Sequence, residues 1–542
     1  MRVFKLALLG AGLGAFAAPA QADMTLVRLT PEQYQRTIHE VFGPSIQLDA
    51  NVVETGFRDQ GLLAVGARKL TLTSAGLERN ETLALQIAKE VVDPKRRATL
   101  IPCKPKAEDA ADAACAGQFI SRVGLHLFRR PLTDGEVKDF TATAAKSTQI
   151  LKSFHAGLSA ALVQMLVAPE FLFRVEHSEP DPAQPGKLRL DAYSRATRLA
   201  FFLWDSTPDE PLLASAGSGE IMTEAGLARQ IDRMLASPKM EYGVRAFFAD
   251  MLGFDDFATL AIDTNLYPKF TKNVEDNARE QTLRTVADHL ITRNRDYRDL
   301  MTTRDTFLTQ SLAAIYGVPL PHRQEMGGAV AWVPYQFPAD DPHVGLLTQV
   351  SFLSLHSHPG NTSPTLRGKA LRENLLCQRV PPPPGNVDFS IVQDTNNPLF
   401  KTVRQRLTAH RNNPVCAGCH RITDPIGLAL EDFDAAGVSR SEENGAPIDA
   451  SGDFSGKPFK NVVELAAILR DEPAVTSCVV DRAFSFGTAR APLAKEAEWL
   501  ATVKADLTKN GVKWRDLVRR IALNPDFYTV PAPETQRADA QK

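Results

Sequence analysis

The stretch NPVCAGCHRITDP (residues 413–425) decides how the fold around it is interpreted. Cys416 and Cys419 stand three positions apart, and His420 follows the second cysteine directly. With six cysteines and eleven histidines in 542 residues, chance gives this CxxCH spacing roughly 0.001 times, and the spacing is the attachment signal of c-type haem. Two thiols add to the two vinyl groups of one haem, and the adjacent histidine ligates the iron. The pattern therefore predicts one covalent haem c, with thioether bonds to Cys416 and Cys419 and with His420 as the proximal iron ligand.

Two other uses of the motif fit the sequence less well. A structural zinc site needs four ligands, and the chain has no second CxxC and no HxxxH. A thioredoxin-like dithiol normally opens a helix after a strand in a βαβ unit, and no such unit is visible around residue 416. Haem c remains the favoured interpretation.

The first residues read as a secretory signal peptide covering residues 1–22. Arg2 and Lys5 give a positive start, a short apolar run follows, and Ala20-Gln21-Ala22 is a small-residue cleavage site. No later segment predicts a membrane span, because the most apolar run is broken by Pro169. We therefore expect a soluble periplasmic protein without an integral membrane span, in a compartment where haem c is attached and disulfides persist.

Composition excludes one class of partner and limits the fold. The hydrophobic fraction is 44%, the charged fraction is 23% and the formal net charge is -2, which is typical of a soluble globular protein and gives no basic excess for nucleic acid. A chain of 542 residues is too long for one core, so several domains are expected.

Four cysteines remain once the CxxC pair is set aside. Cys103 and Cys115 flank a short polar loop whose ends could meet, which favours a disulfide between them in an oxidising compartment. Cys377–Cys478 is then the second pairing, by elimination. The alternative for each cysteine is a free buried thiol.

Helical periodicity dominates the rest of the sequence and predicts a mainly α fold made of several consecutive helical modules. Thr30 with Gln33, and Thr133 with Glu136, have the spacing of helix capping boxes. A cytochrome-c-like haem module is expected near the C-terminus, followed by a small hairpin at residues 445–461. The expected division is a signal peptide (1–22), N-terminal helical domains (23–180), a helical domain (188–265), a haem-bearing domain (266–440) with a proline-rich linker (380–388), a C-terminal helical domain (441–530) and a tail (531–542).

The sixth iron ligand is not fixed by the sequence. The last methionine is Met326, so the downstream methionine of small electron carriers is excluded. His410 is the best-placed distal candidate, because it lies on the same local element as the anchor; His356, His358 or an open position are the alternatives. On the proximal side, a proline carbonyl at Pro425 could accept the Nδ1 proton of His420, or Pro425 could simply end a helical turn.

Several segments resemble one family along nearly the whole mature chain. They are LVRLTPEQYQRTIHEVFG, FISRVGLHLFRRPLTDGEV, LDAYSRATRLAFFLWDSTPDEPLL, HPGNTSPTLRGKALRENLLC, HRNNPVCAGCHRITDPIGLALEDFDAAG and ELAAILRDEPAVTSCVVDRAFSFGTAR. The chain is similar to the planctomycete-type haem-c proteins assembled from consecutive domains of unknown function, which are also common in proteobacteria. The resemblance implies a periplasmic haem-c protein without implying a reaction. It departs from the family at Thr423, where many relatives are expected to carry methionine.

Three functions are compatible with these observations. The leading hypothesis is a monohaem cytochrome that passes electrons to or from a partner oxidoreductase. The alternative is a haem oxidase or peroxidase acting on a small organic substrate, which predicts an open sixth position and a pocket between the haem domain and the N-terminal helices. A third is a binding protein with a structural haem, which predicts a buried haem without an accessible edge.

Overall fold

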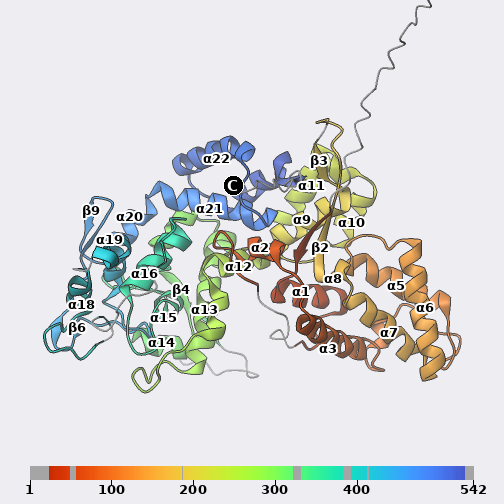
Figure 1. Ribbon diagram of the computed structural model, residues 1–542, viewed down its shortest axis with the longest axis horizontal. Helices are drawn as coiled ribbons and strands as arrows, with labels where there is room; N and C mark the ends of the chain where they lie inside the picture. Colours follow the sequence, from red (N-terminus) through yellow and green to blue (C-terminus); the bar gives the residue numbers. More distant parts are fainter. Residues whose placement is uncertain are drawn as a thin grey trace, which may run out of the picture.

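The computed structural model shows a mainly helical chain, drawn in Figure 1. The predicted signal peptide, residues 383–388 of the predicted linker and the predicted tail lie outside the described residues. The structure describes residues 24–48, 56–185, 187–320, 331–382, 392, 394–411 and 414–530, and in 414–416 the backbone only. None of the helices in these ranges is long and apolar enough to cross a membrane.

The N-terminal part forms a helical lobe with its own core (right in Figure 1). Thr30 and Thr133 cap their helices through the predicted capping boxes, and the predicted Cys103–Cys115 disulfide is present with an S–S distance of 2.01 Å. Phe119 and Leu158 are fully buried at its centre. The elements are β1 (Met24–Arg28), α1 (Pro31–Phe42), α2 (Leu63–Gly66), α3 (Ser74–Val91), α4 (Arg97–Leu100), α5 (Ala113–Leu127), α6 (Asp134–Leu151), α7 (Phe154–Leu166) and α8 (Pro169–Leu172).

A four-stranded antiparallel sheet joins the two ends of the described chain. Its order is β1-β2-β3-β10, so the first strand and the last strand belong to one sheet. Arg198, on the buried helix α9, donates to Glu176 of the sheet over 2.9 Å, and both side chains are 2% exposed. The elements are β2 (Phe173–Pro180), β3 (Leu188–Leu190), α9 (Ala192–Trp204), α10 (Glu210–Gly217), α11 (Glu224–Leu235), α12 (Met240–Met251) and β10 (Thr529–Val530).

The CxxCH segment lies in a second lobe, on the left in Figure 1. The predicted hairpin is present as β8 and β9, and a shorter hairpin of β6 and β7 precedes it. The elements are α13 (Lys272–Ala287), β4 (Asp305–Leu308), α14 (Gln310–Tyr316), β5 (Val333–Gln336), α15 (Val350–Leu355), α16 (Pro364–Ala370), α18 (Val403–His410), α19 (Pro414–Gly427), β6 (Glu442–Glu443), β7 (Ala446–Pro447), β8 (Gly452–Phe454) and β9 (Lys457–Phe459).

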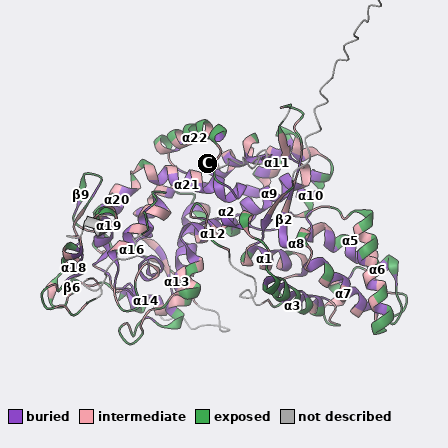
Figure 2. Cartoon of the chain, viewed as in Figure 1, coloured by how far each residue is buried: buried purple, intermediate pink, exposed green. Residues whose placement is uncertain are grey.

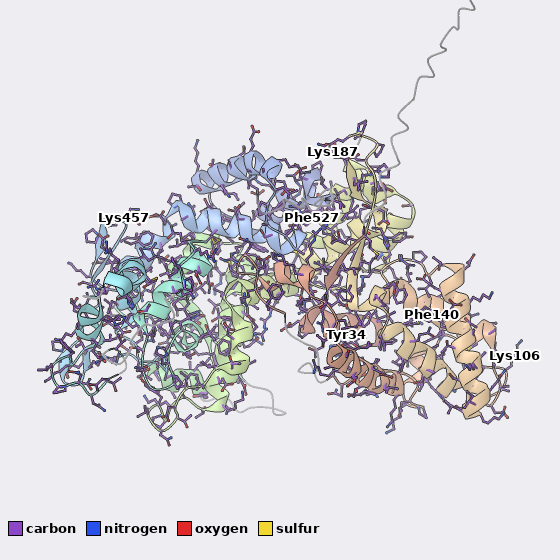
Figure 3. All side chains as sticks on the ribbon, in the orientation of Figure 1. Tyr34, Lys106, Phe140, Lys187, Lys457 and Phe527 are labelled. Atoms are coloured by element: carbon purple, nitrogen blue, oxygen red, sulfur yellow. A yellow bond between two sulfur atoms is a disulfide. The ribbon has the colours of Figure 1, made fainter. Side chains whose placement is uncertain are left out.

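The C-terminal helices lie between the two lobes and are buried on their inner faces (Figure 2). They are α20 (Val462–Arg470), α21 (Pro473–Thr488), α22 (Ala497–Asn510) and α23 (Trp514–Leu523). Phe527 packs on Phe202 of α9 with ring centroids 5.0 Å apart, and Figure 3 shows it inside the molecule while Lys457 lies at the surface. The predicted Cys377–Cys478 disulfide ties α21 to the CxxCH lobe. The C-terminal helices and this disulfide therefore connect the two lobes.

Candidate functional site

The CxxCH motif occupies the first turns of α19, directly after α18. Cys419 is half-buried, and its Sγ lies 3.4 Å from the carbonyl oxygen of Pro381. The side chain of Cys416 lies outside the described residues. The thiol of Cys419 is thus placed at the surface of its helix beside the start of the proline-rich segment.

The ring of His420 is held from one side. His420 is 8% exposed, and its Nδ1 lies 2.9 Å from Oδ2 and 3.0 Å from Oδ1 of Asp424, one turn further along α19. Thr365 Oγ1 on α16 lies 3.3 Å from the same nitrogen. A carboxylate only accepts hydrogen bonds, so Nδ1 carries a proton, and in the neutral form of the imidazole the lone pair is on Nε2. This is the tautomer that a metal-bound histidine needs.

The expected role of Pro425 is corrected by this geometry. Pro425 lies inside α19, which continues to Gly427, so it does not end a helical turn. The partner of His420 Nδ1 is the carboxylate of Asp424 rather than a proline carbonyl. His420 and Asp424 are spaced i and i+4, which places both side chains on one helix face because α19 runs on through the proline.

Two glycines let α19 cross α16 at very short range. A Cβ on Gly368 would lie 2.1 Å from the carbonyl oxygen of Thr423, and one on Gly427 would lie 1.8 Å from that of Pro364. Real Cβ atoms do not approach other atoms closer than 3.0 Å, so neither position accepts a side chain without a backbone shift. The crossing brings Thr365 of α16 to His420 and helps to fix the position of the His420 ring.

His410 faces His420 across the gap between α18 and α19. The two ring centroids are 4.9 Å apart with ring planes at 74°, and His410 is 6% exposed. Metal–imidazole bonds measure about 2 Å, so two histidines on one metal have ring centroids about 6 Å apart. The rings as they stand are therefore too close to ligate one iron together.

The other histidine candidates lie elsewhere. His356 follows α15, its ring contacts Phe352 at 4.9 Å, and its Nε2 is buried without a hydrogen-bond partner among the described residues. Burial lowers the pKa of His356 to about 3, with Arg367 as a smaller cause. His358 is exposed and pairs with Asn361 in a short bridge. No contact between either histidine and His420 is found in the described part of the chain, so of the sequence candidates only His410 meets His420.

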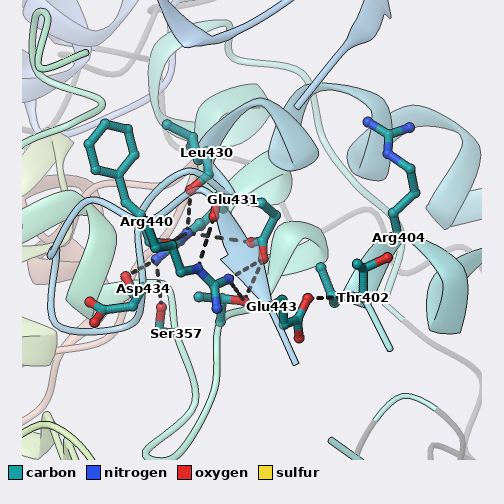
Figure 4. Close-up of polar contacts among 12 residues, drawn as sticks. Ser357, Thr402, Arg404, Leu430, Glu431, Asp434, Arg440 and Glu443 are labelled. Atoms are coloured by element: carbon teal, nitrogen blue, oxygen red, sulfur yellow. Dashed lines mark hydrogen bonds and ion pairs between the residues drawn. The ribbon is translucent and has the colours of Figure 1, made fainter. Parts of the chain in front are cut away.

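A buried ionic network surrounds Arg367 on the same helix α16 (Figure 4). Arg367 of α16 is fully buried and donates to the carbonyl oxygens of Leu430 at 2.8 Å and Asp434 at 2.7 Å. Glu431 accepts from Thr362 at 2.7 Å and from Arg440 at 2.8 Å. Burial lowers the pKa of Arg367 to about 10 and raises that of Glu431. This network could not be predicted from the sequence, because nothing in the helical spacing of Arg367 distinguishes it from a surface arginine.

The helix of His410 has polar anchors of its own, although its Val403 and Leu407 also pack on Leu428 just beyond α19. Glu443, on the β6–β7 hairpin, accepts from Arg406 at 2.6 Å and from the backbone N–H of Val403 at 2.7 Å. Arg406 is 1% exposed, so its charge is matched inside the protein by this carboxylate. α18 is therefore attached to the hairpin, whereas α19 is attached to α16.

The chemistry of these side chains fits the predicted haem. The lone pair of His420 points away from Asp424, the sulfur of Cys419 is one residue away, and imidazole and thiol are groups that bind or attach haem. Among the described residues, no group of three or more His, Cys, Asp or Glu side chains could hold a bare metal ion. The donor set thus fits attachment of a haem better than a protein-only metal cage.

A cleft of about 260 Å³ lies away from these residues. It opens between α1, α5 and the turn before α10, and Glu40, Arg122, His126 and Glu210 are among its lining residues. None of its lining residues comes from the CxxCH lobe. It is therefore not the pocket between haem domain and N-terminal helices that the oxidase alternative predicts.

Comparison with known families gives four matches in series, each described as a protein of unknown function. They are DUF1595 over residues 115–176, DUF1592 over 190–318, DUF1588 over 343–443 and DUF1585 over 455–527. This series is typical of planctomycete-type multi-domain proteins, and the DUF1588 match spans the CxxCH motif. The chain matches no curated protein and no solved structure.

Proposed function

We propose that the chain is a periplasmic monohaem c-type protein that passes electrons to or from a partner oxidoreductase. The observation that carries the proposal is the pair of facing histidines, of which His420 follows the CxxC directly and has its lone pair on Nε2. Haem iron cycles between ferric and ferrous states and so holds or releases one electron. A second buried imidazole facing the first supports six-coordinate iron once the two rings move apart, and such iron transfers electrons and does little else.

Each residue has a defined task in this proposal. Cys416 and Cys419 bind the haem through thioether bonds, and His420 is the proximal ligand. Asp424 and Thr365 orient His420 from behind. His410 would be the distal ligand once its ring moves away from that of His420.

The second candidate, a haem oxidase or peroxidase, is favoured by one observation. The rings of His410 and His420 are too close for both to bind one metal without moving, and the ion pair of Arg406 with Glu443 holds α18 in place. If α18 does not shift in the required direction, the sixth position stays open to a small ligand.

The test uses the full-length protein produced together with haem-maturation machinery. We expect a covalent haem that survives denaturation, and its loss when Cys416 or Cys419 is replaced by serine. Absence of covalent haem in the unaltered chain refutes both candidates.

Ligand binding then separates carrier from enzyme. In a six-coordinate carrier, carbon monoxide and cyanide bind poorly to the unaltered protein and readily to His410→Ala. His358→Ala is the matched control, because His358 is an exposed histidine of the same lobe without contact to His420. Ready ligand binding by the unaltered protein, unchanged in His410→Ala, favours the oxidase or peroxidase.

A further inference from the structure

The buried carboxylate of Asp424 can affect the electronic properties of His420 as well as the orientation of its ring. We propose that Asp424 is a positioning residue that lowers the reduction potential of the haem iron by directing its negative charge onto Nδ1 of His420. The inference rests on the proposed haem function and adds to it a residue that tunes the potential of the haem.

The carboxylate of Asp424 is shielded from water and has few partners. Its side chain is 0% exposed, so water does not screen it. Both carboxylate oxygens lie within 3.0 Å of His420 Nδ1, and among the described residues this is its only ion-pair contact. Its other partners are the neutral hydroxyls of Thr365 at 2.9 Å and Thr423 at 3.3 Å.

An acceptor with a full charge changes what the imidazole donates to a metal. A carboxylate that draws the Nδ1 proton raises the basicity of the lone pair on Nε2, whereas a backbone carbonyl does so far less. A more basic ligand stabilises the ferric ion over the ferrous ion, because the ferric ion carries the larger positive charge. The negative charge of Asp424 acts in the same direction through space, and burial strengthens it.

Thr365 weakens the effect of Asp424 on His420, so a variant of Thr365 tests the same effect independently. Its Oγ1 comes from α16 and lies 2.9 Å from Asp424 Oδ1, so its hydroxyl takes up part of the electron density of the carboxylate. Removing that hydroxyl leaves the charge in place with one donor fewer, and because the 3.3 Å contact of Thr365 Oγ1 with His420 Nδ1 is lost with it, the Nδ1 proton is left to the carboxylate alone. The carboxylate then acts more strongly on His420, and the potential moves the other way from the change caused by neutralising Asp424.

The experiment measures midpoint potentials of the haem-loaded full-length protein by spectroelectrochemistry. Asp424→Asn keeps the shape and removes the charge, and Glu442→Gln is the matched control, because Glu442 is an exposed carboxylate on β6 of the same lobe. Mutation of a group that hydrogen-bonds the second ring nitrogen of a metal-bound histidine typically changes metal affinity or activity by about 10- to 100-fold. We expect Asp424→Asn to favour the reduced state by that factor, which is about 60–120 mV for one electron. Glu442→Gln should leave the potential unchanged.

Thr365→Val should shift the potential in the opposite direction, by a smaller factor. A purely structural role for Asp424 does not produce opposite signs in the two variants. Equal potentials in Asp424→Asn and Glu442→Gln overturn the inference. If Asp424→Asn fails to fold or to load haem, Thr365→Val decides: a lower potential supports the inference, and an unchanged or higher one refutes it.

Failure of the inference and failure of the proposed function are distinguishable. An unaltered chain that carries no covalent haem refutes the proposed function, and with it the inference. A loaded chain whose potential does not respond to Asp424 leaves the haem function intact and refutes only the role of Asp424.

Discussion

Replacement of Gly427 by alanine tests whether the close crossing of α16 and α19 holds the site together. The added Cβ would lie 1.8 Å from the carbonyl oxygen of Pro364, which is backbone and cannot rotate away. The helices must open by at least about 1.2 Å, the difference from the 3.0 Å limit. Gly427 has φ of -74°, so alanine adds no backbone strain and the effect is purely steric.

The expected cost is that of overpacking a rigid contact, about 2–3 kcal/mol. A loss of that size lowers the melting temperature by roughly 4–12 °C in a cooperative domain of about 150–250 residues. Gly418→Ala is the matched control on the same helix, because a Cβ there meets nothing within 4 Å. Alanine is a better helix former than glycine by about 1 kcal/mol, so the control should be neutral or slightly stabilising.

The assay is thermal unfolding of the three full-length proteins. It is followed by far-UV circular dichroism and by the absorption of the proposed haem. Gly427→Ala should melt earlier and should also disturb the haem spectrum, because the crossing carries Thr365 to His420. If Gly427→Ala melts within a degree of Gly418→Ala, the crossing is not a rigid backbone contact and the reasoning is wrong.

Two further predictions concern other parts of the described chain. The pKa of His356 is lowered to about 3, so as the pH falls from 6.5 to 3 the unfolded chain binds a proton at His356 that the folded chain does not. The free energy of unfolding should therefore decline over that window. His356→Gln should flatten the decline, as measured by melting temperature against pH. The Cys377–Cys478 disulfide closes a loop of 101 residues and should contribute about 4.7 kcal/mol, against about 3 kcal/mol for the shorter loop of Cys103–Cys115; paired serine variants compared by melting temperature contradict this if the short loop costs as much.

Local rules of the sequence predicted local structure well. Thr30 and Gln33 form the predicted capping box, because such a box is decided by residues within one turn. The two disulfides followed from the number and spacing of the cysteines together with the expected oxidising compartment. The hairpin of β8 and β9 followed from its turn residues.

The partner of His420 was missed because one local rule was followed too far. Proline usually ends a helix, so the sequence placed a turn at Asp424-Pro425. The helix in fact runs on to Gly427, and the pair at i and i+4 becomes a contact. Contacts made by distant segments, such as Thr365 to His420, carry no signal in the spacing of residues along one chain.

The contacts of α18 and α19 bear on where the proposed site has to move. The glycine crossing leaves no room for α19 to approach α16 more closely. α18 is tied to the β6–β7 hairpin by Glu443, through Arg406 and the N–H of Val403, and Arg404 of the same helix donates to the carbonyl oxygen of Asp449. Val403 and Leu407 of α18 also pack on Leu428, just beyond α19. If the chain binds haem as proposed, the space between His410 and His420 has to open against these contacts, and the choice between a closed electron carrier and an open haem enzyme rests on how far they let α18 move.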